Sequence, residues 1–195
     1  MVTTDIIKQL RDETGVSVMQ CKKALEEAGG DFAKAIVILK KKGADAAAKK
    51  SDRTLNAGII ASYVHATGTT GAMVELACET DFVAKTPEFK QLGYDIAMHI
   101  VALKPEFIKR EDITKEARDL AMSVFEKDVL DKPKEMREKI LEEKLVAYFA
   151  DRVLHEQKFI KNADLSILEL INAYVQKFGE KTEIVRFVRY GVLEK

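Results

Sequence analysis

The stretch GIIASYVHATGTTGAMVELACE, residues 58–79, decides the fold class that the sequence predicts. Two runs rich in β-branched residues flank TGTTG, a glycine-bearing loop of the length that joins hairpin strands. In the second run every other residue from Ala72 to Cys78 is apolar, whereas Glu75 and Glu79 share the opposite face. This alternation predicts an antiparallel strand with one face on a core and the other toward solvent.

Four helices and a late strand are expected after the hairpin. Apolar residues recur at helical spacing behind four start signals, which are Thr86-Pro87, Thr114, Pro133 and Ser166. The last helix has Glu169 at capping-box spacing from Ser166 and ends at Gly179. The run EIVRFVRYGV, residues 183–192, predicts a strand that pairs with the hairpin. This order of elements predicts an α+β core domain at 57–195, with a small antiparallel sheet packed by helices.

Residues 3–42 are expected to form three short helices, which define a first domain at 1–42. The first helix has Thr4 as its expected N-cap. The second begins at Ser17, with Gln20 at capping-box spacing, and the third begins at Asp31 with a helical apolar face. Three helices in so short a segment predict a small bundle near the lower size limit for independent folding.

A basic stretch, KKKGADAAAKKSDR at residues 40–53, follows the bundle and has no large apolar side chain. We therefore expect residues 43–56 to form a linker, whose start can extend the third helix. Two functions are open for this stretch. It is either a basic patch that binds RNA or a solvated tether, as most charge runs are.

The charge balance argues against binding over the whole surface to nucleic acid or anionic lipid, and leaves a local basic patch open. Thirty-two Lys and Arg residues balance thirty-two Asp and Glu residues, so the net charge is zero. The N-terminal sequence MVTTDIIKQL lacks the pattern of a signal peptide, and no apolar run approaches the roughly 18 residues of a membrane span. Two cysteines in a chain of this length predict free thiols. A cytoplasmic protein without a membrane partner is expected.

The sequence gives little support to catalysis or metal binding. His65, His99 and His155 are scattered, and neither Cys21 nor Cys78 has a neighbour at metal-ligand spacing. Phosphate-binding glycine motifs and the HExxH motif are absent from the sequence. Cys78 alternates with core positions of its strand and is predicted to be an inert thiol, as is Cys21. We expect no catalytic residue, no cofactor and no bound metal.

The segment ETDFVAKTPEF, residues 79–89, joins the hairpin to the next predicted helix. It places the acid Asp81 beside the large aromatic Phe82 in a short, rigidly anchored connection. Two interpretations are open. Phe82 either seals the edge of the core while Asp81 caps a turn, or the pair faces a protein partner, because an aromatic anchor beside a charge is typical of interface hot spots.

Several long motifs resemble those of the bacterial and organellar elongation factor Ts family. The segment LRDETGVSVMQCKKAL resembles the N-terminal signature of that family, and ELACETDFVAK resembles its second signature. The segments HEQKFIKNADLSILELI, Gly179-Glu180 and VRFVRYGV are similar to its C-terminal part. The resemblance runs from about residue 4 to residue 192. There are departures from the family pattern at Ser17, Gln20, Ala77 and His155, and none of them touches residues 80–83.

The resemblance implies a function as guanine nucleotide exchange factor for elongation factor Tu, with a ubiquitin-associated (UBA)-like N-terminal bundle. It implies that Thr80, Asp81, Phe82 and Val83 form the site that binds the partner and dislodges its Mg²⁺. In that site Phe82 is inserted between helices of the partner, Asp81 acts near its switch region, and Thr80 and Val83 fix the shape of the corner. It also implies that Val18, Met19 and Lys23 supply docking area from the N-terminal domain. Elongation factor Tu, in its GDP-bound and nucleotide-free forms, is the expected partner.

The resemblance further implies that the chain is a short member of the family. Longer members carry a second core lobe and a protruding helical hairpin, and we expect no stretch of this chain to remain for either. Short members are expected to pair with themselves, which favours a homodimer. Two alternatives come from other classes of function: an RNA- or ribosome-associated binding module that uses residues 40–53, and an enzyme with a nucleophilic Cys78. Direct nucleic-acid binding is not expected.

Overall fold

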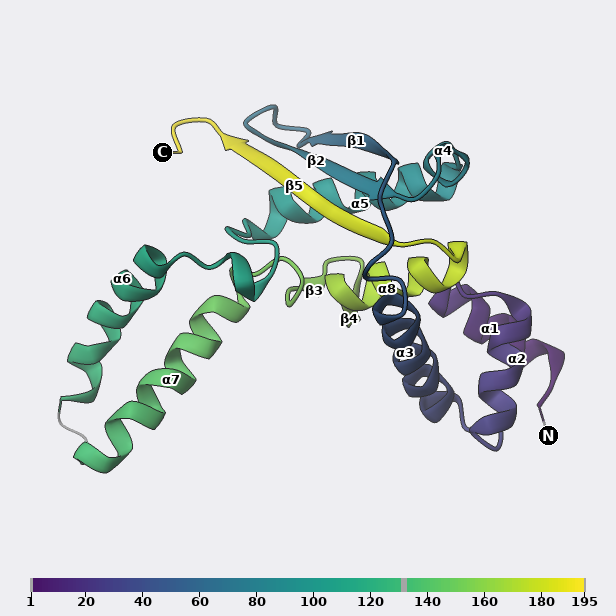
Figure 1. Ribbon diagram of the computed structural model, residues 1–195, viewed down its shortest axis with the longest axis horizontal. Helices are drawn as coiled ribbons and strands as arrows, with labels where there is room; N and C mark the ends of the chain where they lie inside the picture. The colour runs from purple at the N-terminus through teal and green to yellow at the C-terminus, as the bar shows by residue number, and fades with distance from the viewer. Residues whose placement is uncertain (1, 131–132, 195) are drawn as a thin grey trace.

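The computed structural model describes residues 2–130 and 133–194. Figure 1 shows three parts: a sheet with helices beneath it, the N-terminal helices on one side, and a helical hairpin on the other. The mixture of helices with a small antiparallel sheet confirms the predicted α+β class.

The N-terminal helices are α1 (Thr4–Thr14), α2 (Val18–Glu27) and α3 (Phe32–Ala48). The Thr3 hydroxyl accepts a hydrogen bond from the Ile6 N–H, so the N-cap of α1 is Thr3 and not the predicted Thr4. The other two caps are confirmed, because Ser17 accepts from the Gln20 N–H and Asp31 from the Lys34 N–H. A small core holds the bundle together: Leu10, Val16, Cys21, Ala24, Leu25, Ala35 and Leu39.

Helix α3 continues to Ala48, so the first part of the predicted linker is helical. Gly43 is buried where α3 packs on α8 (Ile167–Phe178). A Cβ atom at Gly43 would lie 3.3 Å from the Asn172 carbonyl oxygen, so the missing side chain permits this close approach. Lys40 adds a hydrogen bond from its Nζ to the Asp164 carbonyl oxygen at 2.6 Å. The bundle therefore packs directly against the core.

The sheet contains β1 (Ala57–Val64), β2 (Thr70–Cys78) and β5 (Thr182–Gly191), in the order β1-β2-β5 with both pairings antiparallel. This confirms that the late strand pairs with the hairpin. Helix α5 (Pro87–Leu103) covers one face, where the alternating β2 side chains predicted to be buried are buried. Its N-cap is Thr86 with Pro87 in the first turn, as predicted.

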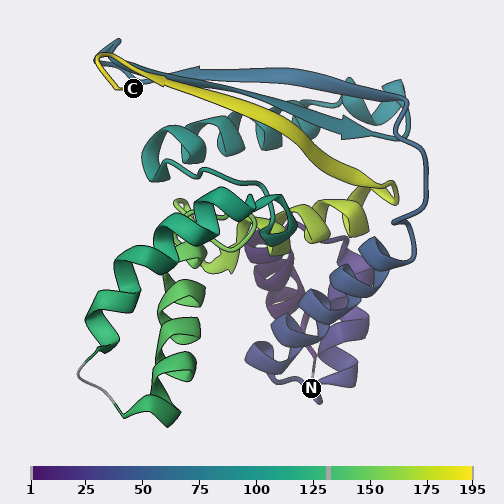
Figure 2. The ribbon, with the colours of Figure 1, turned by 60° about the vertical axis from the view of Figure 1, so that its left-hand side comes forward.

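The second face of the sheet is open among the described residues (Figures 1 and 2). The apolar side chains on this face are exposed: Ile60, Val64, Met73, Val188 and Tyr190. The pairing of Met73 with Val188 and of Val64 with Gly71 places these positions on one surface. We call these five residues the open sheet face.

A helical hairpin projects from the core on the side opposite the bundle (Figure 2). It consists of α6 (Lys115–Glu126) and α7 (Lys134–Ala150), with 3₁₀ turns at Arg110–Asp112 and Lys127–Val129. Buried Ala121, Leu145 and Phe149 join the two helices. The expectation that no stretch remains for a protruding helical hairpin is therefore wrong. Apolar spacing predicted both helices but not the direction in which the pair points.

Helix α8 has the predicted capping box between Ser166 and Glu169 and ends at Gly179, whose φ is 73°. Before it lies a small hairpin that the sequence did not predict, formed by β3 (Lys158–Phe159) and β4 (Asn162–Ser166). These strands are too short to show a period of two residues. Tertiary contacts such as the packing of Phe159 into the core stabilise them.

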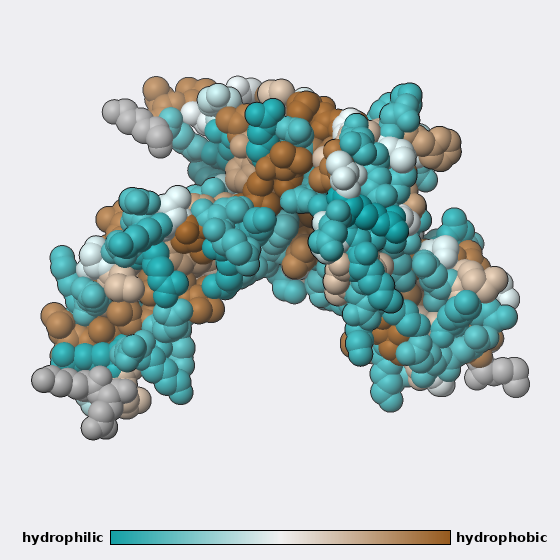
Figure 3. Space-filling view, in the orientation of Figure 1, coloured by the Kyte–Doolittle hydropathy of each residue, from teal (hydrophilic) through white to brown (hydrophobic). Residues whose placement is uncertain are grey.

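Figure 3 shows a largely hydrophilic surface over the N-terminal helices, with hydrophobic side chains gathered near β5 and along the α6–α7 hairpin. In residues 2–130 and 133–194, none of the helices is both long and apolar enough to cross a membrane.

Candidate partner-binding site

The connection after β2 is a single helical turn, α4 (Asp81–Ala84), which the sequence analysis did not predict. Thr80 is its N-cap, and the Thr80 hydroxyl accepts from the Val83 N–H at 3.4 Å. The turn closes with bonds from Ala84 N–H to the Thr80 carbonyl at 3.2 Å and from Lys85 N–H to the Asp81 carbonyl at 3.1 Å. The backbone here has a defined conformation, so it presents its side chains in fixed directions.

Phe82 is the exposed residue of this turn. Its relative exposure is 80%, whereas Val83 and Ala84 are 5% exposed and pack into the main core. Burying a phenylalanine side chain typically stabilises a protein by about 1.5–3 kcal/mol, and the exposed Phe82 ring contributes little of this energy to folding. The interpretation that Phe82 seals the core edge is therefore wrong, and its ring faces solvent or a partner.

Asp81 lies beside Phe82 with its carboxylate in solvent. It forms an i,i+4 ion pair with Lys85 at 2.5 Å, and this hydrogen bond with the Lys85 ammonium lowers the pKa of Asp81. Thr80, and not Asp81, provides the cap of the turn. An exposed ion pair contributes little to folding, so the Asp81 carboxylate can leave Lys85 and pair with a cationic group of a partner at little cost.

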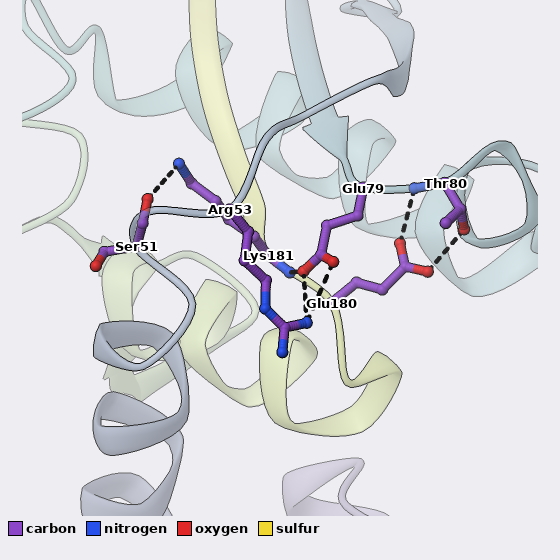
Figure 4. Close-up of polar contacts among 6 residues, drawn as sticks. All are labelled: Ser51, Arg53, Glu79, Thr80, Glu180 and Lys181. Atoms are coloured by element: carbon purple, nitrogen blue, oxygen red, sulfur yellow. Dashed lines mark hydrogen bonds and ion pairs between the residues drawn. The ribbon is translucent and has the colours of Figure 1, made fainter.

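Glu180 holds the start of α4 from the other end of the chain (Figure 4). Its Oε2 accepts from the Thr80 N–H at 3.0 Å, and its Oε1 accepts from the Thr80 hydroxyl at 2.7 Å. The Cys78 thiol donates to the Thr80 carbonyl at 3.2 Å. Three polar groups of Thr80 therefore have partners that fix its position.

The neighbouring pair, Glu79 and Lys181, extends this network to the linker (Figure 4). The Lys181 N–H donates to Glu79 at 2.6 Å, and Arg53 donates to both oxygens of the same carboxylate at 3.2 Å. The Lys181 backbone N–H and then Arg53 lower the pKa of Glu79. Lys181 also donates from Nζ to the Ser51 carbonyl at 2.8 Å. The network thus ties residues after α3 to the segment that carries Phe82.

Sequence reasoning did not identify this network. In the sequence the Gly179-Glu180 pair is recognisable only as part of a family motif, and Thr80 and Glu180 are separated by 100 positions. Periodicity and capping rules operate within a few residues, so they carry no signal for such a contact. The one sequence signal for this contact is Gly179, which ends α8 and so fixes where Glu180 leaves the helix.

The predicted docking residues of the N-terminal domain lie on the outer face of α2. Val18 is 50% exposed, Met19 is 62% exposed, and Lys23 is exposed, whereas Cys21 on the inner face is buried. Helices α2 and α4 lie toward the same end of the molecule in Figures 1 and 2. The structure thus presents two separate surfaces on one side: the α2 face and the Phe82 turn.

The titratable groups elsewhere give no basis for thiol chemistry. Cys21 and Cys78 are both buried, and burial raises the pKa of each thiol; the negative charge of Glu180 raises that of Cys78 further. A buried thiol held protonated is a poor nucleophile, so the surroundings of Cys78 do not favour the alternative of an enzyme that uses this residue. No group of His, Cys, Asp and Glu residues in the described ranges has the arrangement of a metal site.

An exposed aromatic beside a charge, together with an exposed apolar helix face, is the composition typical of a surface that binds another protein. The family model described as elongation factor TS matches residues 6–194. Elongation factor Ts of Thermotoga petrophila is 45% identical over 193 residues, covering 99% of this chain and 97% of the relative. The proteins of that name from Thermosipho melanesiensis and Carboxydothermus hydrogenoformans are each 45% identical over 196 residues; the alignments cover all of this chain, and 100% and 90% of the two relatives respectively.

The chain belongs to the elongation factor Ts family. The family resemblance inferred from the signature motifs is confirmed.

Proposed function

We propose that this protein is the guanine nucleotide exchange factor of elongation factor Tu and acts in the cytoplasm. The observation that carries the proposal is the 80% exposure of Phe82 on a turn whose next two residues are buried. An exchange factor must bind the nucleotide-free partner more tightly than the GDP-bound one. By thermodynamic reciprocity it then weakens GDP binding by the same factor, and this requires no catalytic acid, base or metal of its own.

The proposed mechanism acts through the Mg²⁺ ion of the partner. A GTP-binding protein holds its nucleotide through phosphate contacts and a Mg²⁺ ion that bridges the phosphates to protein oxygens. Mg²⁺ tolerates little distortion of its octahedral shell. Phe82 inserts between helices of the partner and shifts them, which expels the ion and releases GDP. Asp81 contacts groups near the switch region of the partner. Thr80, the N-cap of α4, and buried Val83 fix the shape of the turn.

The direct test is stopped-flow release of a fluorescent GDP from elongation factor Tu. We expect the wild-type protein to accelerate release at substoichiometric concentration, because each molecule acts repeatedly. A release rate equal to the spontaneous rate at any concentration of this protein would overturn the proposal.

The bundle of α1 to α3 is proposed to be a UBA-like docking domain, followed by a linker that begins after α3 ends at Ala48 and by a core domain at 57–195. Val18, Met19 and Lys23 supply its contacts. Their exposure supports this role, and methionine is suited to it because its side chain is flexible and polarisable.

We expect Met19→Ala to weaken binding of nucleotide-free elongation factor Tu about fivefold, since truncating a contact residue outside the hot spot costs roughly 1 kcal/mol. Isothermal titration calorimetry measures the change. Val37→Ala is the matched control, because Val37 is an apolar residue of α3 with 66% exposure outside the predicted docking face. Equal affinities for the Met19 variant and the control would remove Met19 from the interface.

The structure disfavours the alternative in which residues 40–53 bind RNA. Lys40 pairs with Glu169 at 3.2 Å and Lys42 with Glu27 at 2.5 Å, so two cations of this stretch are neutralised within the protein. Arg53 is held by Glu79. Phosphate contacts by this stretch would first have to displace these three acidic partners.

We also propose a homodimer that forms through the open sheet face. Its five exposed apolar residues share one surface of a three-stranded sheet, and sheets commonly bury such a face against a second sheet. The chain mass is 21.9 kDa, so a dimer has twice that mass.

Met73→Lys is expected to convert this dimer to a monomer in sedimentation equilibrium at micromolar concentration. Met73 lies on the central strand of the open sheet face, where a buried unpaired ammonium is costly. Val37→Lys introduces the same charge on α3 and should leave the dimer intact. A monomeric wild-type protein, or a dimeric Met73→Lys variant, would contradict this interface.

A further inference from the structure

We propose that Glu180 is a positioning residue for nucleotide exchange: its carboxylate fixes the turn that presents Phe82. The inference rests on the proposed exchange function. It starts from two hydrogen bonds that join Thr80 to Glu180, from the Thr80 N–H at 3.0 Å and from its hydroxyl at 2.7 Å. Both donors belong to the N-cap of the turn that carries Phe82.

Helix α4 requires support from outside its own sequence. It has four residues, and a single helical turn is unstable by itself because nucleation fixes several dihedral angles for one hydrogen bond. Its capping bond from the Val83 N–H to the Thr80 hydroxyl is long, at 3.4 Å. Burial of Val83 and Ala84 anchors one side of the turn, but the exposed side with Phe82 has no such anchor.

Glu180 is well placed to supply the missing constraint because its own backbone is held on both sides. Gly179 before it ends α8 in the left-handed conformation, and its N–H bonds to the Val175 carbonyl. Lys181 after it donates its N–H to Glu79 at 2.6 Å. One dipeptide, Glu180-Lys181, therefore holds the consecutive residues Glu79 and Thr80 (Figure 4).

The chemistry of the contact requires a carboxylate. Both Thr80 groups donate, and a carboxylate accepts through both oxygens, whereas an amide has one acceptor oxygen and turns an N–H group toward the other donor. Glu180→Gln therefore preserves size and packing but disrupts one of the two bonds. Glu183→Gln is the matched control. Glu183 is a nearby carboxylate on β5 that pairs with Lys181 at 3.3 Å, whereas the hydrogen bonds of Thr80 go to Glu180, Cys78, Val83 and Ala84.

The experiment is a double-mutant cycle on stimulated GDP release, with Glu180→Gln, Phe82→Ala and the double variant. We expect Glu180→Gln to slow release about tenfold, as loss of a hydrogen bond to a charged group typically does, and Glu183→Gln to remain near wild type. If Glu180 acts by presenting Phe82, the same substitution changes the rate by less than about twofold in the Phe82→Ala background.

Amide hydrogen exchange in the free protein gives a second readout. We expect faster exchange at Ala84 and Lys85 in Glu180→Gln, because their N–H groups close the α4 turn, and unchanged exchange in Glu183→Gln. A wild-type release rate, an equal loss in both Phe82 backgrounds, or unchanged amide exchange would each overturn the positioning role. Failure of the wild-type protein to accelerate release would instead refute the exchange function and leave the amide measurement as the test of the Glu180 contact.

Discussion

Phe82→Ala slows the stimulated release of GDP from elongation factor Tu by about thirtyfold or more. Truncating an aromatic anchor at an interface typically costs about 2 kcal/mol or more, and that energy corresponds to about a thirtyfold change. The loss appears in the release step because Phe82 is proposed to act on the partner's helices and not on the nucleotide. Stopped-flow release of a fluorescent GDP at saturating exchange factor measures it.

The same substitution leaves the fold intact. The Phe82 ring is 80% exposed, so its removal creates no cavity, and the melting temperature is expected to change by no more than about 2 °C. Leu120→Ala is the control, because Leu120 is an apolar residue of α6 with 69% exposure far along the chain from the site. A release rate equal to that of the control would reject Phe82 as the acting group.

Gly93→Leu has the largest expected effect on stability. Gly93 is buried where α5 crosses β1, and a Cβ atom there would lie 2.9 Å from both the Ala61 Cβ and the Ile59 Cδ1. A leucine must separate the helix from the sheet, and overpacking of this kind costs about 3 kcal/mol. The melting temperature should fall by about 6–12 °C, measured by circular dichroism.

Gln91→Leu is the matched control for this prediction, since Gln91 occupies an exposed position on the same helix. It adds the same side chain without entering the contact between α5 and β1. Its melting temperature should stay within about 2 °C of wild type. Equal stability of the two variants would show that α5 does not approach β1 as closely as the structure indicates.

Local sequence signals predicted most of the element order. The Thr86-Pro87 start of α5, the Ser166–Glu169 capping box and the stop at Gly179 were all confirmed, because each depends on groups three or four residues apart. The cap of α1 was placed one residue late because Thr3 and Thr4 offer the same hydroxyl. The β3–β4 hairpin was missed because its strands are too short to show a period.

The candidate site was located but not resolved by sequence. The segment around Phe82 was identified from its composition and its family motif, yet both a buried and an exposed ring were compatible with those residues. The one-turn helix, the exposure of the ring and the bonds from Thr80 to Glu180 all required tertiary information.

The sequence by itself determined the α+β class, the position of the longer helices and strands, and membership of the elongation factor Ts family. These features depend on hydrophobic periods, capping residues and signature motifs, which are local properties of the chain. Only the tertiary structure decided that α6 and α7 project as a hairpin, that α3 packs on α8, and that Phe82 is exposed. The reason is physical: burial and long-range hydrogen bonds depend on which segments meet in space, and local patterns place no constraint on a residue 100 positions away.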